Sequence, residues 1–234
     1  MDVIGLLPRL HLLRFPVGQA YLWRDDDAST LIDAGPIGAG RAIADAVTAL
    51  GHAPGDVRRI VLTHFHEDHV GGAGEFAALS GAEVLAHPLD APFVRGELQG
   101  PPPRFEEWEL PIHAEVAPHL PEGTPVPPAA VTDVADGDVL GFGGGARVIH
   151  VPGHTDGSIA LFLPDEAVLF TGDTVAASPV DGTVIPGVFN LSRPQLLASV
   201  ARLAALDAEV ACFGHGDAVV GDAAAALRKA AGVA

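Results

Sequence analysis

The feature that most constrains this chain is a run of ligand-type side chains, Thr63-His64-Phe65-His66-Glu67-Asp68-His69-Val70-Gly71-Gly72. Residues i and i+2 of an extended segment point the same way, so His64 and His66 can hold one ion. Asp68 and His69 stand where the chain turns into a predicted helix, and they can face a second ion. Imidazole and carboxylate are the ligands of a catalytic zinc or a similar metal. The alternative is an incidental surface histidine cluster, and the mid-chain position of the run excludes a tag.

Three further ligand-type residues each follow a predicted strand. His154 lies in Val-Pro-Gly-His-Thr, Asp173 in Thr-Gly-Asp and His215 in Phe-Gly-His-Gly. Loops that leave the same sheet edge can converge on one point, and the neighbouring glycines permit a close approach. A single histidine in a turn is more often a solvated polar group, but the earlier run makes a shared metal site the favoured interpretation.

The order of predicted elements is similar in both halves of the chain. Short extended runs at 10–15, 20–24 and 29–33 predict a β-meander. A helix over 38–50, a strand over 59–63, a helix over 70–79 and a strand over 83–86 follow. Further strands are predicted between 131 and 171, then a helix over 192–206, a strand over 210–213 and an Ala-rich helix over 218–231. Two such halves predict two sheets packed face to face with helices outside, in one domain over 1–234.

Residues 100–130 differ from the rest of the chain. Nine of the 20 prolines fall there, together with Phe105 and Trp108. A long irregular segment in a compact domain is usually functional or disordered. We expect an irregular, lid-like insertion over a site rather than a passive surface insertion. Arg95 and Arg104 nearby could attract an anionic substrate tail, although solvated surface arginines are the favoured interpretation.

The charge composition disfavours several classes of binding partner. The chain has 13 basic and 30 acidic residues, a net charge of −17, which disfavours nucleic acid and anionic membranes as partners. A small-molecule substrate is expected instead. The single cysteine, Cys212, cannot form an internal disulfide and is expected in the core, and the first nine residues read poorly as a signal peptide. We therefore expect a cytoplasmic protein.

These motifs, together with the strand Leu31-Ile32-Asp33-Ala34-Gly35, resemble the metallo-β-lactamase fold superfamily of metallohydrolases, in the family's order and over nearly the whole chain. The resemblance implies an α/β fold, the αββα four-layer sandwich, with a two-metal centre at one edge. It implies that Asp173 bridges the two metals. The other implied ligands are His64, His66 and His154 for the first metal, and Asp68, His69 and His215 for the second.

The same resemblance implies the remaining site residues and the chemistry. Asp33 orients ligand imidazoles, and Asp68 and Asp173 belong to the catalytic centre. Separately from the resemblance, the large apolar side chains of Phe105 and Trp108 in the proline-rich segment, with Phe65 in the histidine run, are expected to line the substrate pocket. Two divalent ions are implied, Zn²⁺ first with iron or manganese as alternatives. They would hold a bridging hydroxide that attacks the carbonyl of a small ester, thioester or lactone.

Departures from individual branches of the family weigh against several activities. Antibiotic hydrolases with a cysteine ligand carry it where this chain has Asp173. Glyoxalase II enzymes add a C-terminal helical domain, whereas a short tail follows His215 here. Ribonuclease Z enzymes carry a basic insertion for tRNA, and acyl-homoserine lactonases use a tyrosine near the metals, whereas Tyr21 lies in the N-terminal meander. The alternatives that stay open are an iron-dependent oxidoreductase similar to persulfide dioxygenases, and β-lactamase or phosphodiesterase activity. A non-catalytic metal-stabilised fold would need a missing ligand, and no ligand is missing.

Overall fold

The computed structural model describes residues 1–119 and 122–233, and its contacts divide the chain into two compact units. Unit 1 comprises Met1–Gly100 and His119–Val134, and unit 2 comprises Pro101–Pro118 and Ala135–Ala234. The proline-rich segment is therefore shared between them. Whether these two units form the single domain predicted over 1–234 is not decided by the division, so the single domain stays a prediction.

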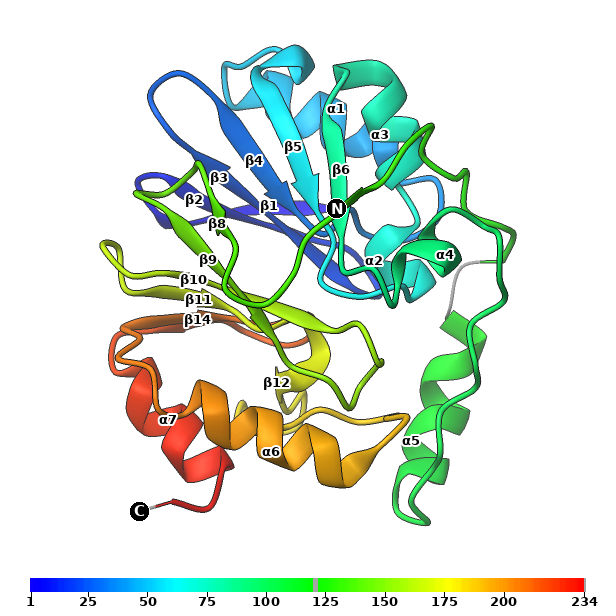
Figure 1. The fold of residues 1–234 in the computed structure, drawn as a ribbon, viewed down its shortest axis with the longest axis vertical. Helices are drawn as coiled ribbons and strands as arrows, with labels where there is room; N and C mark the ends of the chain where they lie inside the picture. The colour runs from blue at the N-terminus through cyan, green and yellow to red at the C-terminus, as the bar shows by residue number, and fades with distance from the viewer. Residues whose placement is uncertain (120–121, 234) are drawn as a thin grey trace. The chain divides into compact units, whose positions relative to one another are not determined.

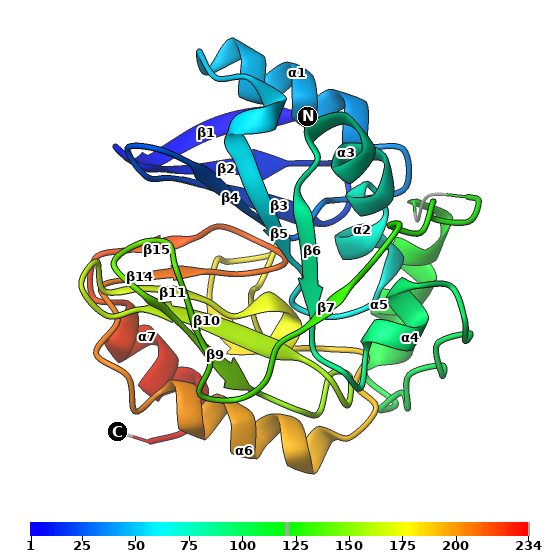
Figure 2. The ribbon, with the colours of Figure 1, turned by 45° about the horizontal axis from the view of Figure 1, so that its top comes forward.

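A seven-stranded sheet forms the centre of unit 1 (Figures 1 and 2). The strands follow one another across the sheet in chain order, antiparallel from β1 to β4 and parallel from β4 to β7. Parallel neighbours place their carboxyl ends at the same sheet edge. The strands are β1 (Asp2–Leu7), β2 (Leu10–Arg14), β3 (Gln19–Arg24), β4 (Ser29–Ile32), β5 (Val57–Val61), β6 (Glu83–Ala86) and β7 (Thr132–Asp133).

Helices of unit 1 bury an apolar stripe against this sheet. Ile43 and Val47 of α1 and Phe76 of α3 share one core cluster with Leu31 and Ile60 of the sheet. Ile43 and Val47 are four residues apart on α1, which is the apolar spacing from which the sequence predicts this helix. The helical segments are α1 (Gly40–Ala49), η1 (Pro54–Asp56), α2 (Glu67–Val70), α3 (Ala73–Ser80) and α4 (Ala91–Val94).

Unit 2 is built on a six-stranded sheet of order β15-β14-β11-β10-β9-β8. Its pairs are antiparallel except β11–β14, which is parallel. A separate pair, β12–β13, is antiparallel. The strands are β8 (Val139–Leu140), β9 (Ala146–His150), β10 (Ile159–Leu163), β11 (Val168–Phe170), β12 (Val175–Ala177), β13 (Val184–Pro186), β14 (Val210–Cys212) and β15 (Val219–Val220).

Two helices, α6 (Arg193–Leu203) and α7 (Ala223–Ala230), cover one face of this sheet (Figure 1). Leu196 and Val200 of α6 and Leu227 of α7 are buried in one cluster with strand residues such as Leu169 of β11. Unit 2 also holds α5 (Glu109–Val116) and η3 (Gly172–Thr174), and η2 (Ala117–His119) follows α5 at the boundary with the second part of unit 1. Within the described part of the chain, none of the helices has the length and hydropathy needed to cross a bilayer.

Two sequence predictions are wrong in part. The segment 100–130 is not irregular throughout, because residues 109–116 form α5; every side chain of α5 except Glu109 is at least partly exposed, so the helix has no apolar stripe to reveal it. The helix predicted over 218–231 begins only at Ala223, because Val219 and Val220 pair with β14 and Gly221 takes a positive φ of 88°. The strand β1 was not predicted.

Candidate metal centre

The four ligand-type residues of the histidine run gather at one end of β5. Thr63 and His64 follow the strand, and His66 precedes α2, which carries Asp68 and His69. The His64 ring lies 4.8 Å from the His66 ring and 4.1 Å from the His69 ring, centroid to centroid. Oδ2 of Asp68 lies 3.6 Å from Nε2 of His69. The sequence-predicted ligands of unit 1 therefore form one compact group.

Asp33 is the anchor of this group. Its Oδ1 accepts a hydrogen bond from the Thr63 amide at 2.7 Å, and its Oδ2 accepts one from the Thr63 hydroxyl at 2.8 Å. The same Oδ2 lies 2.9 Å from Nδ1 of His69. Asp33 is buried and has a positive φ of 57°, a conformation that is costly for a non-glycine residue and persists where its surroundings hold it.

These hydrogen bonds fix the protonation of two imidazoles. A carboxylate only accepts, so Nδ1 of His69 must carry the proton that faces Asp33. The single hydroxyl proton of Thr63 goes to Asp33, so the hydroxyl oxygen accepts from Nδ1 of His64 at 3.0 Å. When either ring is neutral, Nε2 therefore carries the lone pair, which is the tautomer that a metal-binding histidine needs.

The ligand-type residues of unit 2 lie at one edge of its sheet. His154 is in the turn between β9 and β10, Asp173 follows β11 in η3, and His215 follows β14. Because β11 and β14 are parallel and β10 runs against β11, these turns leave from the same edge. Oδ2 of Asp173 lies 3.5 Å from Nε2 of His154 and 3.3 Å from Nε2 of His215. Asp173 thus stands between two imidazoles.

Asn190 orients the His154 ring, and the sequence gives no signal for this role. Nδ1 of His154 lies 3.2 Å from the Val188 carbonyl oxygen and 3.3 Å from Oδ1 of Asn190. The Asn190 amide nitrogen donates to the Gly187 carbonyl at 2.8 Å, which turns the oxygen toward His154. Since both partners of Nδ1 accept, that nitrogen carries a proton, and in the neutral ring Nε2 again carries the lone pair.

Two glycines let backbone approach the ligand-bearing segments closely. A Cβ on Gly18, whose φ is 72°, would overlap the Asp68 carbonyl oxygen, and one on Gly187 would overlap the Asp173 carbonyl oxygen. Only glycine fits at such positions. The predicted need for glycine beside the ligands is also confirmed within the motifs, at Gly153 and Gly216, where a Cβ would overlap neighbouring backbone.

The proline-rich segment contacts the loop that holds His154. The buried carboxylate of Glu109 accepts from the Phe189 amide at 3.1 Å and from the Glu106 amide at 2.9 Å. Phe189 has a positive φ of 59°, so the Glu109 carboxylate holds a strained residue next to Asn190. Residues 101–118 therefore support the His154 loop within unit 2.

The three aromatic residues predicted to line a substrate pocket have different surroundings. Phe65 is buried in the core of unit 1, 4.5 Å from the Phe93 ring. Phe105 packs on the His113 and Phe189 rings. Trp108 is half-exposed, with the Arg193 guanidinium carbon 5.3 Å from its ring centroid. Their role at a pocket, and the lid itself, stay predictions.

No cysteine nucleophile is available. Cys212 is fully buried at the end of β14, and this burial raises the pKa of its thiol far above the ordinary value. A thiol that keeps its proton is a poor nucleophile. The prediction that Cys212 is a core residue is confirmed.

Comparison with known proteins identifies the relatives of this chain. A family model described as the metallo-beta-lactamase superfamily matches residues 13–215, a range that includes every candidate ligand. A hydroxyacylglutathione hydrolase of Cereibacter sphaeroides is 32% identical over 159 residues, which are 67% of this chain and 48% of that protein. The probable metallo-hydrolase YflN of Bacillus subtilis is 30% identical over 198 residues, 80% of this chain and 74% of that protein. The match spans about half the length of that hydroxyacylglutathione hydrolase.

Solved structures show the same fold. A metallo-beta-lactamase family protein from Thermus thermophilus superposes with a TM-score of 0.70 and 29% identity, covering 97% of this chain and 78% of its own. The metallo-beta-lactamase SMB-1 superposes with a TM-score of 0.70 at 22% identity, covering 92% of this chain and 80% of its own. At that identity the second likeness concerns the fold alone.

Proposed function

The chain belongs to the metallo-β-lactamase superfamily and has its α/β fold with mixed sheets, and from this premise we propose that it is a hydrolase that uses two divalent metal ions. The proposed substrate is a small ester, thioester or lactone. The observation that carries the proposal is the common state of His64, His69 and His154. In all three, Nδ1 faces a protein oxygen that accepts from it, so the neutral ring presents the Nε2 lone pair.

The donor set fits two ions such as Zn²⁺. We assign His64, His66 and His154 to the first metal. Asp68, His69 and His215 are assigned to the second, and Asp173 is shared. Two observations within the units support a shared metal centre: the close group of rings around His64, and the position of Asp173 between the imidazoles of His154 and His215. Nitrogen and carboxylate donors are the ligands of hydrolytic zinc sites, with iron or manganese as alternatives.

Bound divalent metals lower the pKa of a water molecule and polarise a carbonyl oxygen, which is the chemistry that ester hydrolysis requires. The residues of this chain prepare the site for it. Asp33 and Thr63 fix the tautomers of His69 and His64, and Asn190 fixes that of His154. The carboxylates of Asp68 and Asp173 offset the positive charge of the ions. Burial keeps the Cys212 thiol protonated, which supports water rather than this thiol as the proposed nucleophile.

The substrate class follows from the relatives and from the charge of the chain. Hydroxyacylglutathione hydrolases, by their name, cleave an acyl group from glutathione, and the family model that matches this chain covers every candidate ligand. A net charge of −17 disfavours nucleic acid as a substrate. We therefore place thioesters first, followed by esters and lactones.

A substrate panel tests this function. Metal-replete protein is assayed against a thioester, an aryl ester, a lactone, a phosphodiester and a β-lactam, before and after chelation. Turnover of a carbonyl ester or thioester that is lost on chelation and restored by Zn²⁺ is expected. Asp173→Ala should lower that rate at least about 100-fold. The matched control, Asp165→Ala, removes an exposed carboxylate from the β10–β11 turn and should keep the rate. Preferential cleavage of the phosphodiester or the β-lactam, or an iron-dependent oxidation, would contradict the proposed function.

A further inference from the structure

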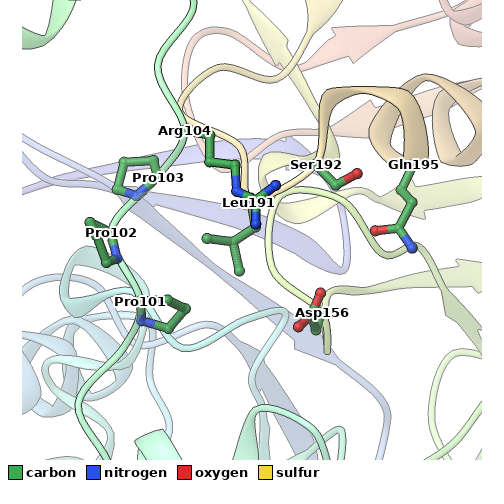
Figure 3. A pocket seen from close by; sticks show the side chains of 8 residues that line it. All are labelled: Pro101, Pro102, Pro103, Arg104, Asp156, Leu191, Ser192 and Gln195. Atoms are coloured by element: carbon green, nitrogen blue, oxygen red, sulfur yellow. The ribbon is translucent and has the colours of Figure 1, made fainter.

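A cavity of about 790 Å³ opens in unit 2 beside the turn that carries His154 (Figure 3). Three consecutive prolines, Pro101–Pro103, and Leu191 give it an apolar wall, and its polar side chains are Arg104, Asp156, Ser192 and Gln195. Small-molecule sites occupy about 300–1,000 Å³ and combine apolar walls with a few polar groups. The cavity has both properties.

Backbone hydrogen bonds hold this cavity to the candidate metal ligand. The Arg104 amide donates to the Asn190 carbonyl at 2.9 Å, and the Leu191 amide donates to the His154 carbonyl at 3.1 Å. Asp156 follows His154 by two residues along the same turn. A group bound in the cavity is thereby held at a fixed position relative to His154.

Two opposite charges line the cavity without neutralising each other. In the ranges 1–119 and 122–233, neither the Arg104 guanidinium nor the Asp156 carboxylate forms an ion pair, although the chain carries 30 acidic residues. The two side chains come from separate segments, the proline stretch and the turn after His154 (Figure 3). A ligand with only a negative charge would be repelled by the Asp156 carboxylate, and a ligand with only a positive charge would be repelled by the Arg104 guanidinium. A ligand that carries both charges can satisfy both groups.

We propose that this cavity binds an amino-acid-like end of the substrate, with its carboxylate on Arg104 and its ammonium group on Asp156. The Ser192 hydroxyl does not cap α6, so it and the Gln195 amide can hydrogen-bond to the same ligand. The proposal rests on the proposed hydrolysis, because it specifies the carrier from which the acyl group is released. It adds a recognition site that acts on the carrier rather than on the scissile bond.

The test uses acetyl thioesters of four thiols that differ by one charge at a time. The thiols are 2-amino-6-mercaptohexanoate, 6-mercaptohexanoate, 6-mercaptohexylamine and 6-mercaptohexanol. For each charged carrier the ratio of kcat/KM to that of the hexanol carrier is measured. Arg104→Gln should lower the ratio of the amino-acid carrier about fivefold, and Asp156→Asn should do the same. Asp156→Asn should raise the ratio of the hexanoate carrier, because it removes a like charge. Arg41→Gln, which removes an exposed arginine of α1, should leave every ratio unchanged.

Equilibrium binding separates a failure of this proposal from a failure of the proposed function. The probe is 2-amino-6-(methylthio)hexanoate, titrated into the metal-replete protein by calorimetry. If no thioester is hydrolysed but the probe binds and both variants weaken it about fivefold, the cavity assignment holds and the hydrolase assignment fails. If the variants change no ratio and leave probe binding unaltered, or if the probe does not bind, the cavity assignment is overturned.

Discussion

Oδ2 of Asp33 lies 2.9 Å from Nδ1 of His69, and both side chains are buried. The same carboxylate accepts two hydrogen bonds from Thr63, whose hydroxyl in turn accepts from His64. One carboxylate therefore orients two candidate ligands that follow it by about 30 residues. Groups of this kind fix the tautomer and direction of metal-binding imidazoles.

The Asp33→Asn variant should bind metal about 10- to 100-fold more weakly. An amide has one accepting oxygen, so it cannot satisfy both Thr63 and His69, and its NH₂ group would face a donor. Metal affinity is measured by competition with a chelator of known affinity. Asp27→Asn makes the same change on an exposed carboxylate in the β3–β4 loop and should bind metal normally. Equal metal affinities in the two variants would show that Asp33 does not support metal binding.

Asn190 should be a positioning residue for His154. Asn190→Ala removes one of the two acceptors of the His154 Nδ1 proton, so the ring loses part of its restraint. We expect metal affinity about tenfold lower, with a smaller loss in Asn190→Asp, which keeps an acceptor at that place. Chelator competition on the three proteins is the measurement. Weaker metal binding by Asn190→Asp than by Asn190→Ala would contradict this role.

Trp108 should affect the substrate rather than the metals. It is half-exposed in unit 2 and its ring faces Arg193, so Trp108→Ala removes an apolar surface and frees a cation. We expect a KM about threefold or more higher, or an altered substrate preference, with unchanged metal content. Leu110→Ala, at a half-exposed position of α5, is the control. A Trp108→Ala protein with an unaltered substrate profile and normal stability would show that the segment does not select substrates.

Burial of Cys212 makes a pH-dependent contribution to stability. Burial raises the pKa of its thiol in the folded state, whereas an unfolded thiol loses its proton at about pH 8.5. The contribution is complete below pH 8.5 and is lost as the pH rises above that value, by about 2 kcal/mol at pH 10. Urea unfolding at pH 7 and pH 10 should show a larger drop for the wild type than for Cys212→Ala. An equal drop in both proteins would show that the thiol is not protected, as would reaction with a thiol reagent in the native state.

The sequence predicted the parts of this protein that depend on residue type and spacing. The histidine run and the turns around His154, Asp173 and His215 were identified because imidazole and carboxylate side chains next to glycine at strand ends have few other uses. The amphipathic α1 was predicted from its apolar spacing. The family resemblance, confirmed by the comparisons, supplied the role of Asp33 that its hydrogen bonds support.

Other features depend on contacts that no local pattern records. Asn190 lies 36 residues from His154, and nothing in its neighbourhood marks it as a partner of that imidazole. Helix α5 has no apolar stripe, and the Glu109 carboxylate that joins it to Phe189 acts across 80 residues. Strand β1 has no fully buried residue, so its six positions lack the alternation that reveals a half-buried strand.

We propose that this chain hydrolyses its substrate with two metal ions held by seven side chains. The most direct test is to titrate metal-free protein with Zn²⁺ while elemental content and turnover of the preferred thioester are measured on the same samples. The account predicts two equivalents bound per chain and a rate that reaches its maximum only as the second equivalent binds, with both features lost in Asp173→Ala. Full turnover by the metal-free protein, or saturation of both content and rate at one equivalent, would contradict it.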